Sequence, residues 1–331
     1  MHVSPTPNPP TAHLRIHQYR TLAPGPRVIV LGAVHGNETC GTRAIERLVQ
    51  ALDSGAQTLA RGQLTLVPVT NPLAYQRQQR NGERNLNRNL LPNASPQDYE
   101  DRIANVLCPL LAEHDVLLDL HSFQSQGEPF VMLGPVDNTG DLEPFAQAAQ
   151  EQALALRLGP RRIVEGWLQT YAVGVQRRLE RTAPGDRAHL LSTDPCYGIG
   201  TTETMRRHGG YALTLECGQH QDPQAPEVAW QAIQRTLAHL QLIDQPAPAP
   251  TPAVEFLRLT EVVDRLHAGD SFARPWSSYD RVQAGQTIGT RHDGTPVCAP
   301  QDGFIVFPNA NAVAGNEWFY FAQPSTRSLG G

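Results

Sequence analysis

The feature that most constrains the fold is an apolar run that ends abruptly in polar residues. Residues 28–31 are Val-Ile-Val-Leu, and after a few small residues the chain presents His35 and Glu38, three positions apart. Such a run is typical of a buried strand. At the mouth of a strand, where a helix begins, an imidazole and a carboxylate can reach one metal ion. The pair suits zinc, which keeps an open position in catalytic sites when three protein groups hold it.

A second apolar run supplies the candidate for the third ligand. Residues 116–120 are Val-Leu-Leu-Asp-Leu, and His121 follows them. Taken alone, the His35/Glu38 pair also fits the start of a surface helix, where a carboxylate suits the helix dipole. A histidine at a second strand end favours the metal site. We therefore predict one zinc ion per chain held by His35, Glu38 and His121, although such donors also bind other divalent metals.

Length and charge narrow the class of protein. The 331 residues are enough for two domains. The formal net charge is −5 and the isoelectric point is about 6.2, so neither nucleic acid nor an anionic membrane is expected as a partner. No apolar run has the length of a transmembrane helix, the N-terminus lacks a secretory signal, and five cysteines without paired spacing fit a reducing cytosol. These observations predict a cytoplasmic protein.

The chain contains no lysine, so all 27 basic residues are arginine. Mechanisms that need a lysine Schiff base or a phosphate-binding lysine are therefore excluded. For the same reason the C-terminal hairpins described below, which resemble those of carrier domains, cannot bear a lipoyl or biotinyl group.

Strands and helices alternate from residue 27 onward. Predicted strands cover residues 27–33, 63–69, 116–120, 130–133 and 211–215, and predicted helices cover residues 38–52, 96–113, 142–157 and 226–242. This alternation predicts an α/β fold with a mixed, mostly parallel sheet covered by helices. Residues 1–25 are expected to form an arm and an edge strand, and residues 157–201 a polar, irregular stretch. In such sheets, sites gather beyond the carboxyl ends of the strands.

The composition changes after residue 243. We predict a catalytic domain over residues 1–243, a Pro/Ala linker over 244–253 and an all-β capping domain over 254–331. In the last part, Asp293-Gly294 and Asp302-Gly303 separate short apolar runs, as hairpin turns do. The tail from Gln323 is expected to be disordered.

Two further groups of residues point to hydrolytic chemistry. Glu216 directly follows the predicted strand 211–215 and fits a general base beside a metal-activated water, although a salt bridge to Arg206 or Arg207 would also explain it.

The loop 71–88 contains four arginines. Arginine forks match carboxylates and stabilise oxyanions, whereas a solvated basic loop is the alternative that we prefer for Arg77 and Arg84.

Four motifs in order resemble the succinylglutamate desuccinylase/aspartoacylase family, which belongs to the zinc carboxypeptidase-like enzymes. The resemblance covers about residues 27–243 and implies the fold of that group. The motifs are His35-Gly36-Asn37-Glu38, Asn71-Pro72 with Arg80 and Asn87-Arg88, Asp119-Leu120-His121, and Glu216-Cys217-Gly218. The resemblance implies that His35, Glu38 and His121 bind zinc, Arg80 stabilises the oxyanion, Asn87 and Arg88 hold the substrate α-carboxylate, and Glu216 activates the water.

The resemblance extends more loosely to two other residues. Tyr320 follows Asn316-Glu317, as a tyrosine of the aspartoacylase β-domain does, and would reach the active site. Arg206, ten residues before Glu216, would bind the acidic side of a substrate. The interval from His121 to Glu216 is 95 positions (216 − 121), longer than expected for these acylases. The extra residues, about 157–200, would form a lid or a homo-oligomer contact.

These features predict a zinc-dependent amidohydrolase that removes an acyl group from a small N-acyl amino acid. A metallocarboxypeptidase or cell-wall-peptide amidase is the first alternative, although a capping domain would block long peptides. A non-catalytic zinc-binding protein whose β-domain binds a partner is the second, and it would leave Glu216 without a role.

Overall fold

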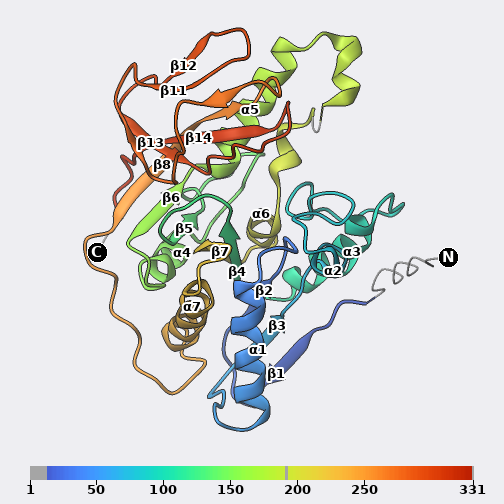
Figure 1. Cartoon of the computed structure of the whole chain (residues 1–331). Coiled ribbons are helices and arrows are strands. Elements are labelled where there is room, and N and C mark those ends of the chain that lie inside the picture. Colours follow the sequence, from blue (N-terminus) through green and yellow to red (C-terminus); the bar gives the residue numbers. More distant parts are fainter. Residues whose placement is uncertain (1–12, 191–192, 330–331) are drawn as a thin grey trace, which may run out of the picture.

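The computed structural model describes residues 13–190 and 193–329, and its elements follow one another from the N-terminus to the C-terminus in Figure 1. Seven α-helices lie in these residues: α1 (Cys40–Asp53), α2 (Pro72–Arg77), α3 (Tyr99–Ala112), α4 (Ala148–Ala155), α5 (Trp167–Arg181), α6 (Thr201–Arg207) and α7 (Ala225–His239). The strands of the first two thirds are β1 (His17–Arg20), β2 (Arg27–Gly32), β3 (Gln63–Val67), β4 (Val116–Phe123), β5 (Phe130–Leu133), β6 (Arg162–Glu165) and β7 (Tyr211–Gln219).

The predicted fold class is confirmed, because a large mixed sheet is covered by helices and followed by a β-rich C-terminal region. At its centre β3, β2, β4 and β7 are parallel, whereas β1 is antiparallel to β3 and β5 is antiparallel to β7. Val28 and Val30 belong to the hydrophobic cluster on one face, with residues of α1, α4 and α7, and Ile29 and Leu31 belong to the cluster on the other face, with residues of α3 and α6. A strand buried on both faces needs a continuous apolar run, which residues 28–31 supply.

Two helix predictions were wrong in their bounds. Helix α3 begins at Tyr99 rather than near Pro96, because the Asp98 carboxylate accepts a hydrogen bond from the Asp101 backbone amide and caps the helix there. Helix α4 covers only Ala148–Ala155 of the predicted 142–157.

The stretch 157–201 was predicted to be irregular, and this was wrong. It contains β6 and α5, followed by two short 3-10 turns (Pro184–His189 and Pro195–Gly198). Ile163 and Val164 are buried in the sheet, and Leu168, Tyr171 and Val175 form the buried stripe of α5 at helical spacing. The buried side of α5 also contains Thr170, Gly174 and Arg178, and these residues hide the apolar pattern in the sequence.

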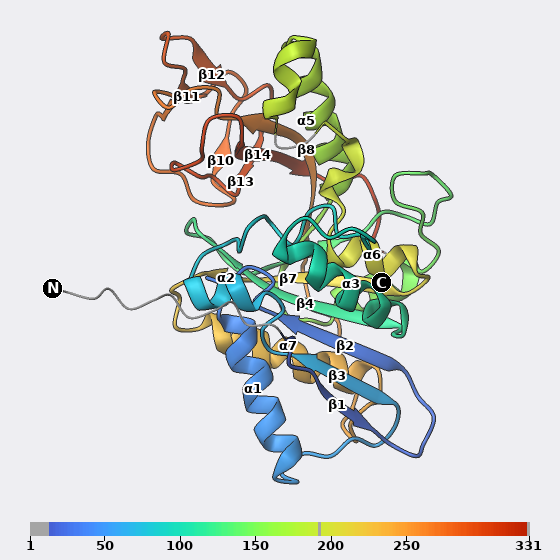
Figure 2. The same ribbon diagram turned by 90° about the vertical axis from the view of Figure 1, so that its right-hand side faces the viewer.

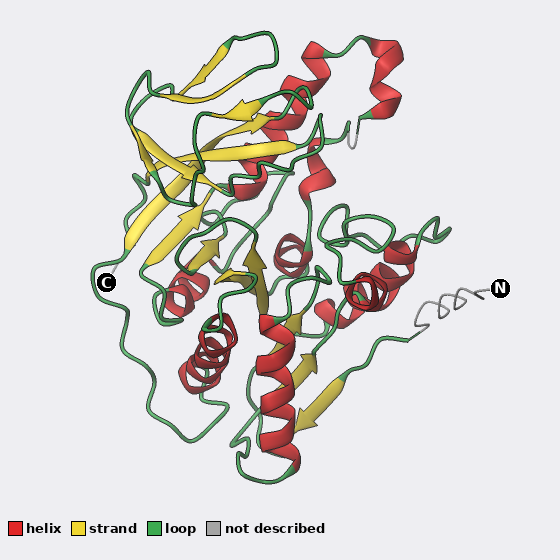
Figure 3. Ribbon diagram, in the orientation of Figure 1, coloured by secondary structure: helices red, strands yellow, loops and turns green. Residues whose placement is uncertain are grey.

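The C-terminal elements are all strands: β8 (Glu255–Asp264), β9 (Ser271–Phe272), β10 (Arg281–Val282), β11 (Thr287–Thr290), β12 (Pro296–Cys298), β13 (Gly303–Val306) and β14 (Glu317–Pro324). Figure 3 shows them gathered at one end of the molecule. Strand β8 pairs in parallel with β6, and β14, β13 and β10 follow in the same eleven-stranded sheet. The predicted domain boundaries therefore stay a prediction, since both parts share one sheet.

The predicted turns and tail have mixed outcomes. Asp293-Gly294 connects the antiparallel pair β11 and β12, as predicted. Asp302-Gly303 is not a hairpin turn, because β12 lies in a small three-stranded sheet and β13 in the large one. The tail from Gln323 is ordered through residue 329, because Arg327 is bound by Glu165 and by the carbonyl of Gly134. Within the described residues, no helix is long and apolar enough to cross a membrane.

Candidate functional site

The carboxyl ends of β2 and β4 bring the predicted metal ligands together. The two strands are parallel and in register, with Gly32 opposite Leu120. His35 and Glu38 lie in the loop between β2 and α1, and His121 lies within β4. Between the first two residues the chain passes so close to the backbone of Ala74 that only glycine fits at position 36.

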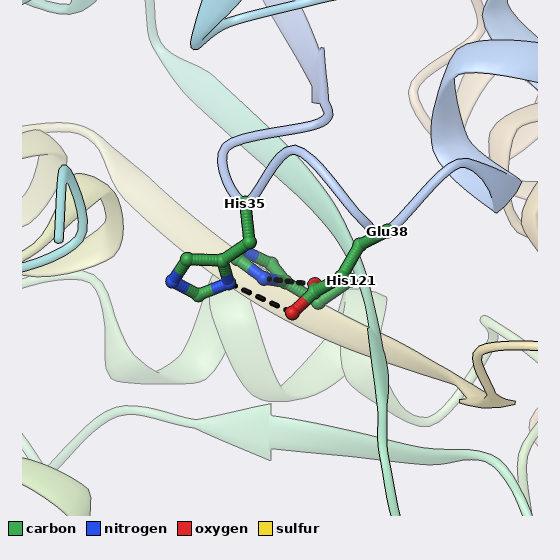
Figure 4. Close-up of side chains that lie close together, drawn as sticks. All are labelled: His35, Glu38 and His121. Carbon is green, nitrogen blue, oxygen red and sulfur yellow. Dashed lines mark hydrogen bonds and ion pairs between the residues drawn. The ribbon is translucent and has the colours of Figure 1, made fainter. Parts of the chain in front are cut away.

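The carboxylate of Glu38 contacts both imidazoles, as the dashed lines in Figure 4 show. Its Oε1 is 2.9 Å from Nδ1 of His35, and its Oε2 is 2.9 Å from Nδ1 of His121. One ligand atom from each of the three residues lies within 4.8 Å of the others, and all three residues are buried. The predicted ligands thus form one compact cluster of the donor types that zinc prefers.

The outer nitrogens of both rings also face oxygen acceptors. Nε2 of His35 is 3.0 Å from Oδ1 of Asn85, and Nε2 of His121 is 2.9 Å from Oδ2 of Asp119. Burial lowers the pKa of His35, so its ring is neutral and carries only one N–H, and it cannot donate to an acceptor at both nitrogens. A cation between the Nδ1 atoms and Glu38 removes this conflict, and outer acceptors of this kind orient metal-binding histidines. The residues present therefore fit a metal ion.

The charges of the cluster are strongly coupled. Burial, assisted by the Arg80 guanidinium, lowers the pKa of His35 to about 4. Burial would also lower the pKa of His121. The carboxylates of Asp119 and Glu38 have the larger effect and raise the pKa of His121 well above the usual value. Burial would raise the pKa of Glu38, yet the two histidines lower it well below its ordinary range. The cluster thus keeps a carboxylate ionised in a buried position.

Glu216 lies beside the cluster, on the neighbouring strand. It is opposite His121 in the register of β4 and β7, and it lines the same cavity. Its Oε2 is buried without a hydrogen-bond partner, and burial raises the pKa of Glu216 to about 8. Among the described residues no ion pair joins it to Arg206 or Arg207, so the salt-bridge alternative has no support.

The predicted anion-binding residues occupy different positions around the cluster. Nη1 of Arg80 donates to Oε1 of Glu38 at 3.1 Å, and the Arg80 side chain is half exposed. The side-chain oxygen of Asn87 accepts from the backbone amide of Thr201. The Arg88 guanidinium lies over the rings of Trp167 and Tyr171, 4.7 and 5.0 Å from their centroids.

Tyr320 and Arg206, which were also predicted to bind the substrate, line the cavity but differ in their hydrogen-bond partners. The hydroxyl of Tyr320 is buried and has no hydrogen-bond partner. Arg206, in contrast, donates to Glu151 through Nε and Nη2, to Glu143 through Nη1 and to the carbonyl of Ala212. Its guanidinium therefore has no free pair of donors for a substrate carboxylate.

Sequence reasoning missed the contributions of Asp119, Asn85 and Trp167. Asp119 was detectable, because side chains two apart on a strand share a face and Asp119 precedes His121 by two residues. Trp167 lies in the stretch that was predicted to be irregular, and nothing local in the sequence places it over Arg88.

The cavity has a volume of about 630 Å³. The metal cluster, Arg80, Asn87, Arg88 and Glu216 line one part of it, and α6 and the loop before α4 line another. Phe307 and Tyr320 of the C-terminal region also line it. A concave space with a metal cluster, a buried carboxylate and arginines is typical of metal-dependent hydrolases.

The comparisons with known proteins agree with the resemblance seen in the sequence. Residues 24–161 match the model of the succinylglutamate desuccinylase/aspartoacylase catalytic domain. None of the curated proteins with which the chain was compared matches it.

Solved structures show that the fold is shared over nearly the whole chain. A succinylglutamate desuccinylase/aspartoacylase from Rhodobacter sphaeroides has 18% identity and a TM-score of 0.71, covering 95% of this chain and 90% of that one. The ectoine utilization protein EutE from Ruegeria pomeroyi has 18% identity and a TM-score of 0.66, covering 93% and 88%. An aspartoacylase family protein from Mesorhizobium loti has 22% identity and a TM-score of 0.64, covering 95% and 90%.

Proposed function

We propose that this protein is a zinc-dependent amidohydrolase that releases the amino acid from a small N-acyl amino acid. The observation that carries the proposal is the buried, unpartnered carboxylate of Glu216 beside the His35/Glu38/His121 cluster. A buried carboxylate without a partner is costly to the fold. A role in proton transfer would explain why the protein keeps this carboxylate in a buried position.

Zinc bound at the cluster would supply a Lewis acid for the amide carbonyl and lower the pKa of water. His35, Glu38 and His121 would hold it. Glu216 takes a proton from the attacking water while the water oxygen bonds to the carbonyl carbon. Glu216 then gives this proton to the nitrogen as the C–N bond breaks, so that a carboxylic acid and a free amino acid result. The pKa of about 8 fits a group that both accepts and donates a proton near neutral pH.

The arginines complete the proposed roles. Arg80 lies 3.1 Å from Glu38 and lines the cavity, so its exposed guanidinium can stabilise the oxyanion that develops on the carbonyl. Arg88, with Asn87 beside it, holds the α-carboxylate of the substrate. Tyr320 offers a free hydroxyl to the same space. We propose further that the protein acts in the cytoplasm without a nucleic-acid or membrane partner.

A panel of N-acetyl, N-formyl and N-succinyl amino acids tests the proposal, with the protein first stripped of metal and then reloaded with zinc. The expected result is the release of free amino acid from one class of substrate by the reloaded protein alone. Blocked peptides serve as the comparison. Hydrolysis of the peptides and of no acyl amino acid would point instead to a peptidase.

A further inference from the structure

An aromatic surface of α5 lies against the Arg88 side chain in the wall of the cavity. Trp167 and Tyr171 are four positions apart on this helix, so their rings share a face, and the ring centroids are 5.7 Å apart. The Arg88 guanidinium lies 4.7 Å from the ring centroid of Trp167 and 5.0 Å from that of Tyr171. At both distances the face of an aromatic ring attracts a cation.

Arg88 forms no ion pair with another of the described residues. Glu317 acts on its charge, but the Glu317 carboxylate is paired with Arg178 at 3.4 Å. Arg88 donates to the carbonyl of Asn87 at 2.8 Å and to the hydroxyl of Tyr171, and its other N–H groups have no partner in the described part of the chain. The guanidinium therefore keeps donors for a ligand, and rings rather than a carboxylate hold it in place.

The Trp167 ring is also part of the cavity wall. The residue is half-buried and lines the cavity together with Arg88 and Tyr320. The rings of Trp167 and Tyr320 are 5.4 Å apart at an angle of 43°, and the Tyr320 hydroxyl is buried without a partner. Trp167 thus contacts two residues to which the proposed function gives a role in substrate binding.

The start of α5 places the Trp167 ring. Strand β6 ends at Glu165, and Gly166 has a φ of +88°, which glycine adopts without strain, so the chain turns and α5 begins at Trp167. The helix is fixed to the C-terminal strands, because the hydroxyl of Thr170 donates to the carbonyl of Leu259 at 2.9 Å. Figures 1 and 2 show α5 beside β8 and β14. The ring is therefore carried by a rigid element rather than by a loop.

We propose that Trp167 is a positioning residue, whose ring holds the Arg88 guanidinium in the orientation that binds the α-carboxylate of the substrate. This inference rests on the proposed function, which assigns that carboxylate to Arg88. A guanidinium is planar, so a ring against its face leaves the N–H groups at its edge free for two parallel hydrogen bonds to a carboxylate. Without the ring, ordering the long arginine side chain costs conformational entropy at the moment of binding.

The test measures how strongly the enzyme distinguishes a free α-carboxylate from an uncharged group. The substrates are the acyl amino acid that the wild type hydrolyses best and the same compound with a carboxamide in place of its α-carboxylate. In the wild type, kcat/KM should be about 30-fold or more higher for the acid, because the amide cannot form the charged hydrogen bonds to Arg88. In Trp167→Leu this ratio should fall about tenfold, mainly through a higher KM for the acid.

Two further variants separate stacking from packing. Trp167→Phe keeps an aromatic face and should keep most of the ratio. Trp230→Leu removes a ring whose centroid lies 3.9 Å from the Arg47 guanidinium, a pair of the same kind outside the cavity lining, and should keep the whole ratio. Zinc is measured on every sample, so that loss of metal is not taken for loss of substrate binding.

A Trp167→Leu variant with the wild-type ratio of acid to amide hydrolysis would overturn the inference. A wild type that does not prefer the acid would overturn it too. In both cases the observed turnover leaves the deacylase function intact. Absence of turnover on the whole panel would instead remove the deacylase function.

An NMR measurement decides the inference if no acyl amino acid is hydrolysed or if Trp167→Leu fails to fold. The Nε–H signal of Arg88 is assigned by its loss in Arg88→Gln. The ring current of Trp167 should place this signal upfield of ordinary arginines, and N-acetylglycine should shift it whereas N-acetylglycinamide should not. A signal at the ordinary position, or the same response to both compounds, would refute the inference.

Discussion

At the scale of single residues, the site depends on groups that orient the proposed ligands. Asp119 is fully buried and lies 2.9 Å from Nε2 of His121, where it fixes the ring with Nδ1 toward Glu38. Removing such an outer partner weakens metal affinity by roughly 10–100-fold. We expect Asp119→Asn to lose zinc affinity to this extent in a competition titration. Asp115→Asn is the control. It removes a partly exposed ion pair with Arg27 next to the start of the same strand and should bind zinc like the wild type.

Gly36 imposes a steric condition on the same loop. A Cβ at this position would overlap the backbone of Ala74, which cannot move away as a flexible side chain does. Gly36→Ala should therefore destabilise the fold by about 1–3 kcal/mol and displace His35 and Glu38, with a loss of bound zinc. Gly185→Ala is the matched control, because a Cβ there meets no atom within 4 Å. Zinc retention by Gly36→Ala at wild-type level would show that the loop adapts.

At the scale of elements, Asp270 connects the segment after β8 with the β11–β12 hairpin. It accepts from Arg291 and from the backbone amides of Leu266, His267 and His292. Burial opposes ionisation of Asp270, but these hydrogen bonds outweigh it and lower its pKa to about 2. A carboxylate with a lowered pKa stabilises the fold above its unfolded pKa, and this contribution disappears as the pH falls from about 4 to 2.

Asp270→Asn should therefore cost about 2 kcal/mol at pH 7, measured by urea unfolding. The difference from the wild type should shrink as the pH falls below about 4. Asp293→Asn, at the exposed tip of the hairpin, serves as the control. A constant difference between Asp270→Asn and the wild type from pH 7 to pH 3 would exclude the charge as its cause.

The sequence predicted the elements whose pattern is local and missed those that depend on distant partners. Apolar runs such as residues 28–31 and 116–120 mark central strands, and their polar ends predicted where His35, Glu38 and His121 meet. Helix α5 was missed because its buried side includes Thr170, Gly174 and Arg178 beside the apolar residues. Nothing local indicates that Arg206 is held by Glu143 and Glu151, which are 63 and 55 residues away in the sequence.

At the scale of the whole molecule, the parallel pairing of β6 with β8 joins the C-terminal strands to the main sheet. One hydrophobic cluster contains Phe123 and Val164 of the main part together with Leu257 and Tyr320 of the C-terminal region. These surfaces are buried against each other, beside a second cluster around Trp276 and Trp318 that belongs to the C-terminal region alone. The C-terminal region, which lines part of the cavity, is thus continuous with the sheet that carries the site.

We expect the described fold to unfold in one transition for this reason. Trp276 and Trp318 are buried in the C-terminal region and report on it by fluorescence once Trp167 and Trp230 of the main part are replaced by phenylalanine, whereas far-UV circular dichroism follows the helices of the main part. Coincident midpoints in guanidinium chloride are the prediction. An earlier fluorescence transition would instead show that residues 254–331 unfold as a separate domain.

The most direct test of the proposed function combines the metal content and the activity of Glu216→Gln. Glu216 is not among the predicted ligands, so the variant should keep one zinc ion per chain while it loses the hydrolysis of the best acyl amino acid by about 100-fold or more, as expected when a general base is removed. Metal analysis and amino acid release would be measured on one sample. A variant that keeps zinc and full activity would contradict the account, because it would leave the buried carboxylate without its proposed role.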